Sequence, residues 1–343
     1  MLNFLSKDIG IDLGTANTLI YVKGKGIVLR EPSVVACSKY DRKILAVGYD
    51  AKEMIGKTPD SIRAIYPLKE GVISDFQMTY AMIKIFFQKV LKASAFTKPR
   101  VVACVPAGVT GVERRAVEDA IMQSGAKEVF IVEESLAAAI GAGLPVMEPK
   151  GSMILDIGGG TSECAVVSLG AVVTSQTIRI AGNTFDEYIM EYVKQKHNLI
   201  IGDKTAEDIK IKLGTVSNLV GANERLEIKG RDNISSLPRS IEITSAEIVE
   251  ALSEPIDNII DALKVTLEET PPELAGDIVT GGITISGGGA MLKGLDVVLS
   301  ERTSLPVYIA NEPLDCVAKG TGMLLEEIDT LKMVQNAARR RFY

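Results

Sequence analysis

Residues 9–15 read IGIDLGT, and residues 153–159 repeat the pattern as MILDIGG. In both places an apolar run ends in Asp, an apolar residue and Gly. Small and hydroxyl residues follow, and then a second apolar run at 19–22 or 164–167. Two apolar runs joined by a glycine-rich turn are typical of a β-hairpin. The repeat therefore predicts two related halves, each opening with a hairpin.

The remainder of the first half predicts alternating strands and helices, as in an α/β domain. Capping boxes at 74–77 and 110–113 should each open a helix with one apolar face. Strands are expected at 101–105 and 129–132, and a helix of small residues at 134–143. Glycines 141 and 143 and Pro145 mark the expected crossing into the second half.

The second half predicts the same alternation. A capping box is expected at 184–187, a helix over about 205–214, and a long helix over about 245–269 that bends at Pro255. A strand at 283–286 should run into Gly287-Gly288-Gly289 and a helix from about Ala290. Residues 218–239 are polar and charged, and we expect them to form a solvated excursion.

Composition excludes several classes of protein. The chain has 343 residues, 46% of them apolar, which is enough for two domains with cores of their own. Its four cysteines stand singly without a Cys-x-x-Cys pair, which predicts reduced core residues of a cytosolic protein. No stretch approaches about 20 consecutive apolar residues and the start lacks a signal-peptide pattern, so we expect neither a membrane span nor secretion.

The charge distribution argues against a nucleic-acid partner. The net charge is −6, and basic residues are scattered except for the run at 339–341, whereas nucleic-acid binding needs clustered bases. The single histidine, His197, cannot form a histidine metal site alone. We expect it to be a solvated surface residue.

Two common phosphate-binding motifs are missing. Gly56-Lys57-Thr58 looks like the end of a P-loop, but Ala51 stands where the first glycine belongs, and no glycine cluster has the spacing GxGxxG. What remains is the pair of turns at 12–18 and 156–162, each with backbone N–H groups, hydroxyls and one carboxylate. Two such turns facing each other would clasp a polyphosphate, with Asp12 and Asp156 directed at Mg²⁺ through its waters.

Each turn taken alone fits a plain glycine-rich hairpin better than a ligand site. The pair is more specific, because the triple glycine at 287–289 also follows a strand and only glycine lets backbone approach a ligand closely. The combination predicts a nucleotide site.

These motifs resemble the two phosphate loops and the adenosine motif of the actin, Hsp70 and sugar-kinase superfamily, over nearly the whole chain. The resemblance is to the MreB family of bacterial actins in particular, through DLGTANT at 12–18, EE at 133–134 with AAAIG at 137–141, DIGGGT at 156–161 and TPPEL at 270–274. It implies an α/β, actin-like ATPase fold with two related domains around a nucleotide cleft, each divided into a large and a small subdomain.

The resemblance also implies domain boundaries. Domain I would span 1–145, with its small subdomain at about 33–74. Domain II would span 146–343, with its small subdomain at about 182–247, and the C-terminal segment of about 320–343 would pack back on domain I.

Individual site residues follow from the same resemblance. The nucleotide ATP would be contacted by Asp12, Gly14, Thr15, Ala16 and Asn17 in the first loop, by Gly158, Gly159, Gly160 and Thr161 in the second, by Glu207 and Lys210 near the sugar and base, and by Gly287, Gly288, Gly289 and Ala290 at the adenosine. Glu207 and Lys210 are one helical turn apart and share a face. Mg²⁺ would be held through water by Asp12 and Asp156.

A catalytic role is implied for two residues. Glu134 matches the family position that orients the attacking water together with Thr161, a contribution of about 10²- to 10⁴-fold. Ser135 departs from the family pattern, because relatives usually carry proline there. The resemblance therefore implies a weak ATPase that hydrolyses ATP slowly.

Membrane contact and assembly are further expectations from the family. Apolar residues at the start (Leu2, Phe4 and Leu5) and the pair Ala95 and Phe96 resemble membrane-touching features. One buried Phe or Leu contributes only about 1.5 to 3 kcal/mol, so a filament would be needed to multiply such contacts. The implied partners are the chain itself, the inner face of the cytoplasmic membrane, the wall-synthesis machinery and a transmembrane adaptor, with a cytoplasmic, peripheral location.

Three other functions share the fold. The main alternative is a small-molecule kinase of the sugar or acetate type, although the sequence shows no sugar-site signature. An Hsp70-type chaperone would need a peptide-binding domain after the ATPase. A plasmid-segregation or cell-division actin would differ only within the filament class. The expected function is a bacterial actin whose membrane-associated filaments organise cell-wall synthesis and maintain cell shape.

Overall fold

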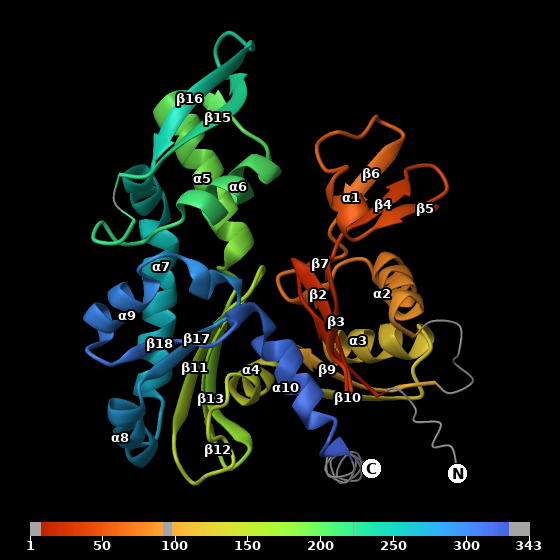
Figure 1. Cartoon of the computed structure of the whole chain (residues 1–343), viewed down its shortest axis with the longest axis vertical. Coiled ribbons are helices and arrows are strands. Elements are labelled where there is room, and N and C mark those ends of the chain that lie inside the picture. The colour runs from red at the N-terminus through yellow and green to blue at the C-terminus, as the bar shows by residue number, and fades with distance from the viewer. Residues whose placement is uncertain (1–7, 92–97, 222, 329–343) are drawn as a thin grey trace. The chain divides into compact units, whose positions relative to one another are not determined.

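The computed structural model describes residues 8–91, 98–221 and 223–328 (Figure 1). These residues fall into two compact units. The first lies within Met1–Glu148, Leu169–Ala171 and Leu314–Tyr343, and the second within Pro149–Ser168 and Val172–Pro313. Among the described residues, no helix has both the length and the apolar content needed to cross a bilayer.

The first unit is built on a five-stranded sheet. Its strand order is β10 (Glu128–Glu133), β9 (Arg100–Val105), β1 (Ile9–Leu13), β2 (Asn17–Val22) and β3 (Gly26–Pro32). Strand β1 is antiparallel to β2 and parallel to β9. The strands expected at 101–105 and 129–132 are confirmed as β9 and β10, and every residue from 101 to 105 is buried.

Smaller sheets complete the strands of this unit. Three strands pair in the order β5 (Ile44–Val47), β4 (Val35–Ser38) and β6 (Ile62–Ile65), beside the short helix α1 (Tyr49–Lys52). Strands β7 (Leu68–Lys69) and β8 (Val72–Ile73) form a two-stranded ribbon. The chain therefore enters the three-stranded sheet directly from β3 and leaves it toward β7.

Two helices of the first unit begin close to the predicted positions. Helix α3 (Gly111–Gln123) starts at the expected capping box, in which Thr110 and Glu113 bond reciprocally. Helix α2 (Phe76–Leu91) starts one residue later than the predicted box implied, because Asp75 accepts the hydrogen bond from the Met78 N–H. The expected apolar face of α2 is confirmed by the buried side chains of Met82, Ile83, Phe86 and Phe87.

Glycines bring two further helices into close contact. Helix α4 (Glu134–Gly141) follows β10 directly, and α10 (Cys316–Leu324) runs beside it (Figure 1). A Cβ atom on Gly141 would lie 1.8 Å from the carbonyl oxygen of Cys316, and one on Gly320 would lie 1.8 Å from that of Ala137. No side chain fits at either position, so the two backbones can touch only where glycine stands.

The second unit repeats the strand order of the first. Its sheet is β13 (Ala171–Ile178), β12 (Ser162–Ser168), β11 (Ser152–Ile157), β17 (Ile283–Ser286) and β18 (Val307–Ile309). Like β1, strand β11 has an antiparallel hairpin partner on one side and a parallel strand on the other. The predicted pair of hairpins and the α/β class are both confirmed.

The polar region expected at 218–239 is largely exposed, as predicted, but part of it forms regular strands rather than an irregular excursion. Strands β15 (Arg225–Asp232) and β16 (Pro238–Thr244) form a hairpin that joins β14 (Leu199–Ile200) in a three-stranded sheet. Only one face of this hairpin is covered, with Ile228 and Ile243 buried. Charged residues occupy the other face. Because they are so numerous, the alternation of apolar and polar residues that marks a half-buried strand was not recognised in the sequence.

The helices of the second unit correct several boundaries. Helix α5 (Gly182–His197) starts before the predicted box at 184–187, and α6 (Asp203–Leu213) ends at Gly214 as expected. Helix α7 (Ser245–Glu268) contains Pro255 and opens with a capping box of Thr244 and Glu247 that we did not predict. Helix α8 (Pro272–Gly281) was also not predicted.

The helix expected from Ala290 is wrong. The triple glycine leads instead into a short 3₁₀ turn, η1 (Gly288–Met291), and the α-helix α9 (Leu295–Thr303) starts only after Gly294. Leu292 is extended and Gly294 is left-handed with φ +76°, so the backbone cannot continue as a regular helix before Leu295.

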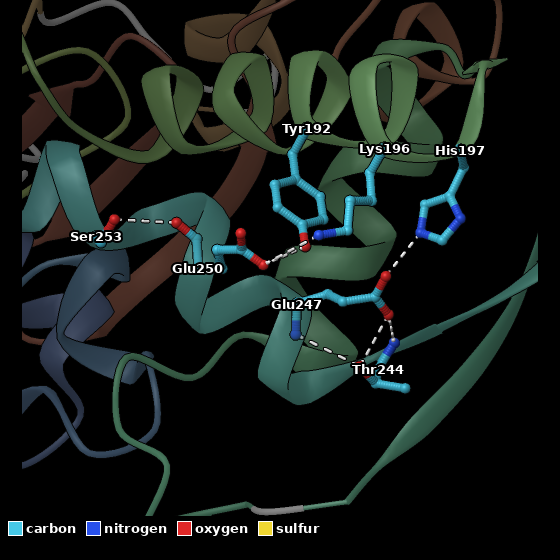
Figure 2. A network of polar contacts seen from close by, with 7 residues as sticks. All are labelled: Tyr192, Lys196, His197, Thr244, Glu247, Glu250 and Ser253. Carbon is cyan, nitrogen blue, oxygen red and sulfur yellow. Dashed lines mark hydrogen bonds and ion pairs between the residues drawn. The ribbon is translucent and has the colours of Figure 1, made fainter.

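The interpretation of His197 as a solvated residue is wrong as well. Its Nε2 lies 2.6 Å from Oε1 of Glu247, so the end of α5 is linked to the start of α7 (Figure 2). The same carboxylate accepts from the Thr244 N–H and hydroxyl. Burial raises the pKa of Glu247, but these hydrogen bonds outweigh it and hold that pKa below its usual range. One turn earlier, Tyr192 donates to Glu250 over 2.6 Å.

The cysteines lie where the sequence predicted, since all four are buried and none forms a disulfide. Burial raises the pKa of the Cys164 thiol to about 12, and the nearby carboxylate of Glu163 adds to this. A thiol with so high a pKa carries almost no thiolate at neutral pH and is unreactive.

Candidate functional site

The first predicted loop is the turn between β1 and β2. It starts at Gly14, where a Cβ atom would lie 2.6 Å from the carbonyl oxygen of Asn17, so the turn can close this tightly only with glycine. Thr15 is buried, Ala16 half-buried and Asn17 exposed. Asp12 is half-buried on β1, and its cross-strand neighbour on β2 is Leu19.

Ser33, at the start of the connection from β3 to β4, holds this loop from behind. Its N–H donates to the carbonyl of Ala16 (2.9 Å), and its hydroxyl donates to the carbonyl of Gly14 (2.7 Å). The hydroxyl of Thr18 lies 2.8 Å from the Ser33 hydroxyl. Ser33 and Thr18 are both completely buried.

A second segment touches the same loop. The N–H of Gly71, in the turn between β7 and β8, donates to the Thr15 hydroxyl over 3.0 Å. This bond uses an acceptor lone pair of Thr15, so the hydroxyl proton can still be donated to another group. The connection into the three-stranded sheet and the two-stranded ribbon that follows this sheet therefore both contact the first loop.

The second predicted loop is the turn between β11 and β12. Its ends are closed by a bond from the Gly158 N–H to the carbonyl of Thr161 (2.9 Å). Two of its carbonyls accept hydrogen bonds from the first turn of α5, where the N–H of Gly182 donates to Gly158 (3.0 Å) and that of Asn183 to Gly159 (2.8 Å). These are N–H groups that a helix start leaves without intrahelical partners.

Lys210 reinforces the start of α5. Its ammonium group donates to the carbonyl of Gly182 (2.7 Å) and pairs with the carboxylate of Asp186 (2.8 Å). Glu207 is half-buried one turn earlier on α6. The structure thus gives Lys210 a role in supporting α5, and the contact of Glu207 and Lys210 with a sugar or base stays a prediction.

Asp156 is a buried carboxylate at the end of β11. The Ser286 hydroxyl on β17 donates to its Oδ1 over 2.5 Å, and Glu163, also buried, is its cross-strand neighbour on β12. Burial raises the pKa of Asp156 to about 6, although the Ser286 hydrogen bond acts in the opposite direction. The two matched aspartates of the repeat therefore occupy different surroundings.

The triple glycine packs against the end of β11. Gly287 has φ +79°, and a Cβ atom there would lie 2.3 Å from the carbonyl oxygen of Ile157. One on Gly289 would lie 2.1 Å from Cγ2 of the same residue. Gly288 is exposed and Ala290 buried. The close approach that the glycines allow in this structure is to the residue before the second loop.

Glu134 is the first residue of α4, and Glu133 precedes it as the N-cap. Glu134 is half-buried and Ser135 is completely buried. A carboxylate in the first turn of a helix is stabilised by the helix dipole. Thr161, its predicted catalytic partner, is buried at the end of the second loop.

The structure brings the predicted residues together in two groups. Within the first unit, Gly14, Thr15 and Ala16 form the turn between β1 and β2, with Asp12 and Asn17 on the adjoining strands, and Glu134 directly follows β10. Within the second unit, the second loop is adjacent to the glycines 287–289 through Ile157, and α5 links it to Lys210. The proposed membrane residues Leu2, Phe4, Leu5, Ala95 and Phe96 lie outside the described residues.

Sequence reasoning missed the residues that support the loops. Ser33 follows Pro32 without any motif, and Gly71 lies in a short ribbon. Ser286 was included in the expected strand at 283–286, whereas Glu163 lies between the second turn and the apolar run at 164–167 and was given no role. Once the hairpin register is known, Glu163 on β12 lies opposite Asp156 on β11. This pairing was the sequence signal that could have revealed a neighbour of Asp156.

Comparison with known proteins extends over nearly the whole chain. Residues 6–333 match the family described as MreB/Mbl protein. The chain is 53% identical to the cell shape-determining protein Mbl of Bacillus cereus, covering 95% of this chain and 98% of that protein. It is 51% identical to the cell shape-determining protein MreB of Escherichia coli K12, covering 94% of each.

Solved structures agree with the sequence comparison. Crystal structures of MreB5 of Spiroplasma citri, one bound to AMPPNP and one to ADP, match with a TM-score of 0.90 and 40% identity. The match covers 96% of this chain and 98% of the other. On the sequence match, the shared fold and the two glycine loops, this chain belongs to the MreB/Mbl family of bacterial actin homologues.

Proposed function

We propose that this protein binds ATP with Mg²⁺ at its two loops, hydrolyses it slowly, and assembles into membrane-associated filaments that organise cell-wall synthesis and maintain cell shape. Its relatives are named for cell-shape determination, and a 40%-identical relative binds AMPPNP and ADP. The alternative of a sugar or acetate kinase is not favoured, because these relatives match along almost the whole chain.

One observation carries the nucleotide proposal. In each loop two carbonyls are hydrogen-bonded to the protein behind it, Gly14 and Ala16 in the first loop and Gly158 and Gly159 in the second. The C=O and N–H of a trans peptide point in opposite directions, and the described residues contain no cis peptide. Each loop therefore turns backbone N–H groups forward, which is the arrangement that binds phosphate oxygens.

The donor set also fits Mg²⁺. This ion prefers oxygen ligands and keeps several of its waters, and Asp12 and Asp156 offer one carboxylate at each loop. Bound Mg²⁺ would neutralise charge that develops on the phosphates. The raised pKa of Asp156 means that its carboxylate is costly to ionise when no cation is near, so the residue is suited to receiving one.

Hydrolysis is assigned to Glu134 with Thr161. We infer that the Glu134 carboxylate orients the attacking water and that the Thr161 hydroxyl helps to position it. Glu134 is held at the first position of α4, directly after a buried strand, so its backbone is well anchored. A serine replaces the usual proline next to it, so the start of α4 lacks the fixed φ that proline would give.

Assembly and location complete the proposal. The proposed partners are further copies of the chain, the inner face of the cytoplasmic membrane, the wall-synthesis machinery and a transmembrane adaptor. Weak apolar anchors hold a protein at a bilayer only when many act together, so membrane binding should require the filament.

The test is sedimentation and negative-stain microscopy of the purified protein with anionic liposomes, under ATP, ADP or no nucleotide. Wild type should form liposome-bound filaments with ATP. Glu134→Ala should still assemble but release at least tenfold less phosphate, whereas the exposed-carboxylate control Glu301→Ala should behave as wild type. A protein that stays monomeric throughout and turns over ATP only with an added sugar or acetate would contradict the proposal and restore the kinase alternative.

A further inference from the structure

Ser33 is a buried residue that lies in neither glycine loop and yet makes three hydrogen bonds to one of them. Its N–H and its hydroxyl bind the carbonyls of Ala16 and Gly14, and the Thr18 hydroxyl is within 2.8 Å of its oxygen. Ser33 stands where β3 ends and the chain enters the three-stranded sheet. It therefore connects the first loop to a separate part of the unit.

The direction of each hydrogen bond follows from the number of protons available. A carbonyl oxygen can only accept, so Ser33 must donate its single hydroxyl proton to Gly14. Because that proton is then used, the Thr18 hydroxyl must be the donor in its contact with Ser33. The chain of donation runs from Thr18 to Ser33 to Gly14, and it fixes the orientation of both hydroxyls.

These bonds set two peptide planes of the loop. With the Gly14 carbonyl directed at Ser33, the N–H of Thr15 in the same trans peptide points away from Ser33. With the Ala16 carbonyl also directed at Ser33, the N–H of Asn17 points the same way. Both forward N–H groups of the first loop are thus oriented by one residue.

The Gly14 plane is the one that needs such a constraint. Glycine has no Cβ and populates backbone conformations that other residues avoid, so the peptide after Gly14 can rotate more easily than its neighbours. Its carbonyl is bound by a side-chain hydroxyl, which one substitution removes. The Ala16 carbonyl is bound by a backbone N–H, which a substitution at Ser33 leaves in place.

We propose that Ser33 is a positioning residue for nucleotide phosphates, because its hydroxyl holds the Gly14 peptide so that the Thr15 N–H faces the ligand. This inference rests on the proposed nucleotide function. Ser33 acts through the loop and does not itself touch the ligand, so its contribution should appear in phosphate contacts and leave recognition of the nucleoside unchanged.

The experiment compares adenosine, ADP and AMPPNP, each with Mg²⁺, by competition against a fluorescent ADP on the full-length protein. Ser33→Ala should lower the affinity for AMPPNP about tenfold, which corresponds to about 1.4 kcal/mol of binding free energy. Its affinity for adenosine should stay within twofold of that of wild type. Thr18→Val removes only the hydroxyl that donates to Ser33 and should lower the affinity for AMPPNP about threefold.

The matched control is Thr79→Val. Thr79 is a completely buried residue of the same unit whose hydroxyl shares its proton between the carbonyls of Asp75 (2.9 Å) and Pro67 (3.3 Å) and makes no hydrogen bond to the first loop. It should lower the melting temperature to a similar extent as Ser33→Ala but leave all three affinities within twofold of wild type. If Ser33→Ala does not fold, Ser33→Cys, which retains a weak donor, takes its place and should weaken AMPPNP by about fivefold.

Three outcomes would count against the inference. Equal losses for adenosine and AMPPNP would mean that Ser33 only stabilises the unit. Unchanged AMPPNP affinity in a folded Ser33→Ala variant would refute the positioning role. A larger loss of AMPPNP affinity in Thr18→Val than in Ser33→Ala would refute the order of donation. Failure of wild type to bind AMPPNP at all would instead refute the nucleotide proposal, so the two failures are distinguishable.

Discussion

The two glycine loops are near-copies in sequence, but the protein supports them in different ways. The carbonyls of the second loop are bound by backbone N–H groups at the start of α5, while a key carbonyl of the first loop is bound by the Ser33 side chain. A backbone support survives almost any single substitution, whereas a side-chain support is lost with one. The difference teaches that a repeated binding motif need not carry repeated supports, because each support comes from a different part of the chain.

The matched aspartates differ in the same sense. Asp12 is half-buried opposite Leu19, whereas Asp156 is buried opposite Glu163 and bonded to Ser286. Equal residues in equal positions therefore have unequal electrostatic surroundings. The second loop should be the one whose stability depends on pH and on a bound cation.

The largest effect should come from Gly287→Ala, which removes the support of the second loop at Ile157. Its φ is +79° and the new Cβ would lie 2.3 Å from a backbone oxygen, so we expect a loss of about 3 to 5 kcal/mol in unfolding free energy. Gly24→Ala is the control, with φ +77° and no atom within 4 Å, and should cost only about 1 kcal/mol. Urea denaturation of both variants measures the difference in unfolding free energy. Similar losses of unfolding free energy would show that the left-handed backbone conformation, and not the contact with Ile157, determines the cost.

The next effect concerns the pH dependence that Asp156 introduces. Its pKa is about 6 in the folded protein against 3.8 as the ordinary value, so between these values the folded state holds more protons than the unfolded one. The stabilisation is complete below about pH 4 and is lost as pH rises through about 6, which amounts to about 2 to 3 kcal/mol.

Asp156→Asn cannot titrate, so its unfolding free energy should lack this decline. The measurement is urea denaturation of both proteins at pH 4 and pH 7 in EDTA, without nucleotide. Parallel pH dependence of wild type and variant would mean that Asp156 ionises in the folded protein as easily as in water. The Asp12→Asn variant serves as the comparison from the first loop.

A smaller effect is expected from Lys210→Met, which weakens the helix start behind the second loop. The substitution removes the donor to the Gly182 carbonyl and the cation beside Asp186. Both charged side chains are more than four-fifths buried, so we expect a loss of about 2 kcal/mol in thermal or urea unfolding. Lys212→Met, on the exposed side of the same helix, should change stability by less than about 0.5 kcal/mol.

The smallest effect should come from Ser162→Ala, and it tests the comparison directly. The Ser162 hydroxyl donates to the carbonyl of Ile180 next to the second loop, so the loss of one neutral hydrogen bond should cost about 1 kcal/mol in stability. Because the backbone bonds from α5 remain, AMPPNP affinity should stay within about twofold, in contrast to Ser33→Ala. A tenfold loss would show that the second loop also depends on a side-chain hydroxyl.

Much of the fold was predictable because it rests on local patterns. The hairpins of β1-β2 and β11-β12, the capping box of α3 and the apolar face of α2 all depend on residues close together in sequence. The hairpin of β15 and β16 was missed because only one of its faces is covered, and its charged face dominated the composition. Helix α8 was missed because Pro271 and Pro272 follow directly after the expected end of the long helix, where proline normally indicates a stop, although proline also starts helices.

The sequence by itself determined the repeat, the α/β class, the two loops and the family, because these depend on which residues follow one another. Only the tertiary structure decided what stands behind each loop: Ser33 comes from 19 residues beyond Gly14, and Ser286 from 130 residues beyond Asp156. Hydrogen bonds act over about 3 Å in space whatever the separation along the chain. The partners that orient a peptide or shift a pKa are therefore set by folding, and no local pattern announces them.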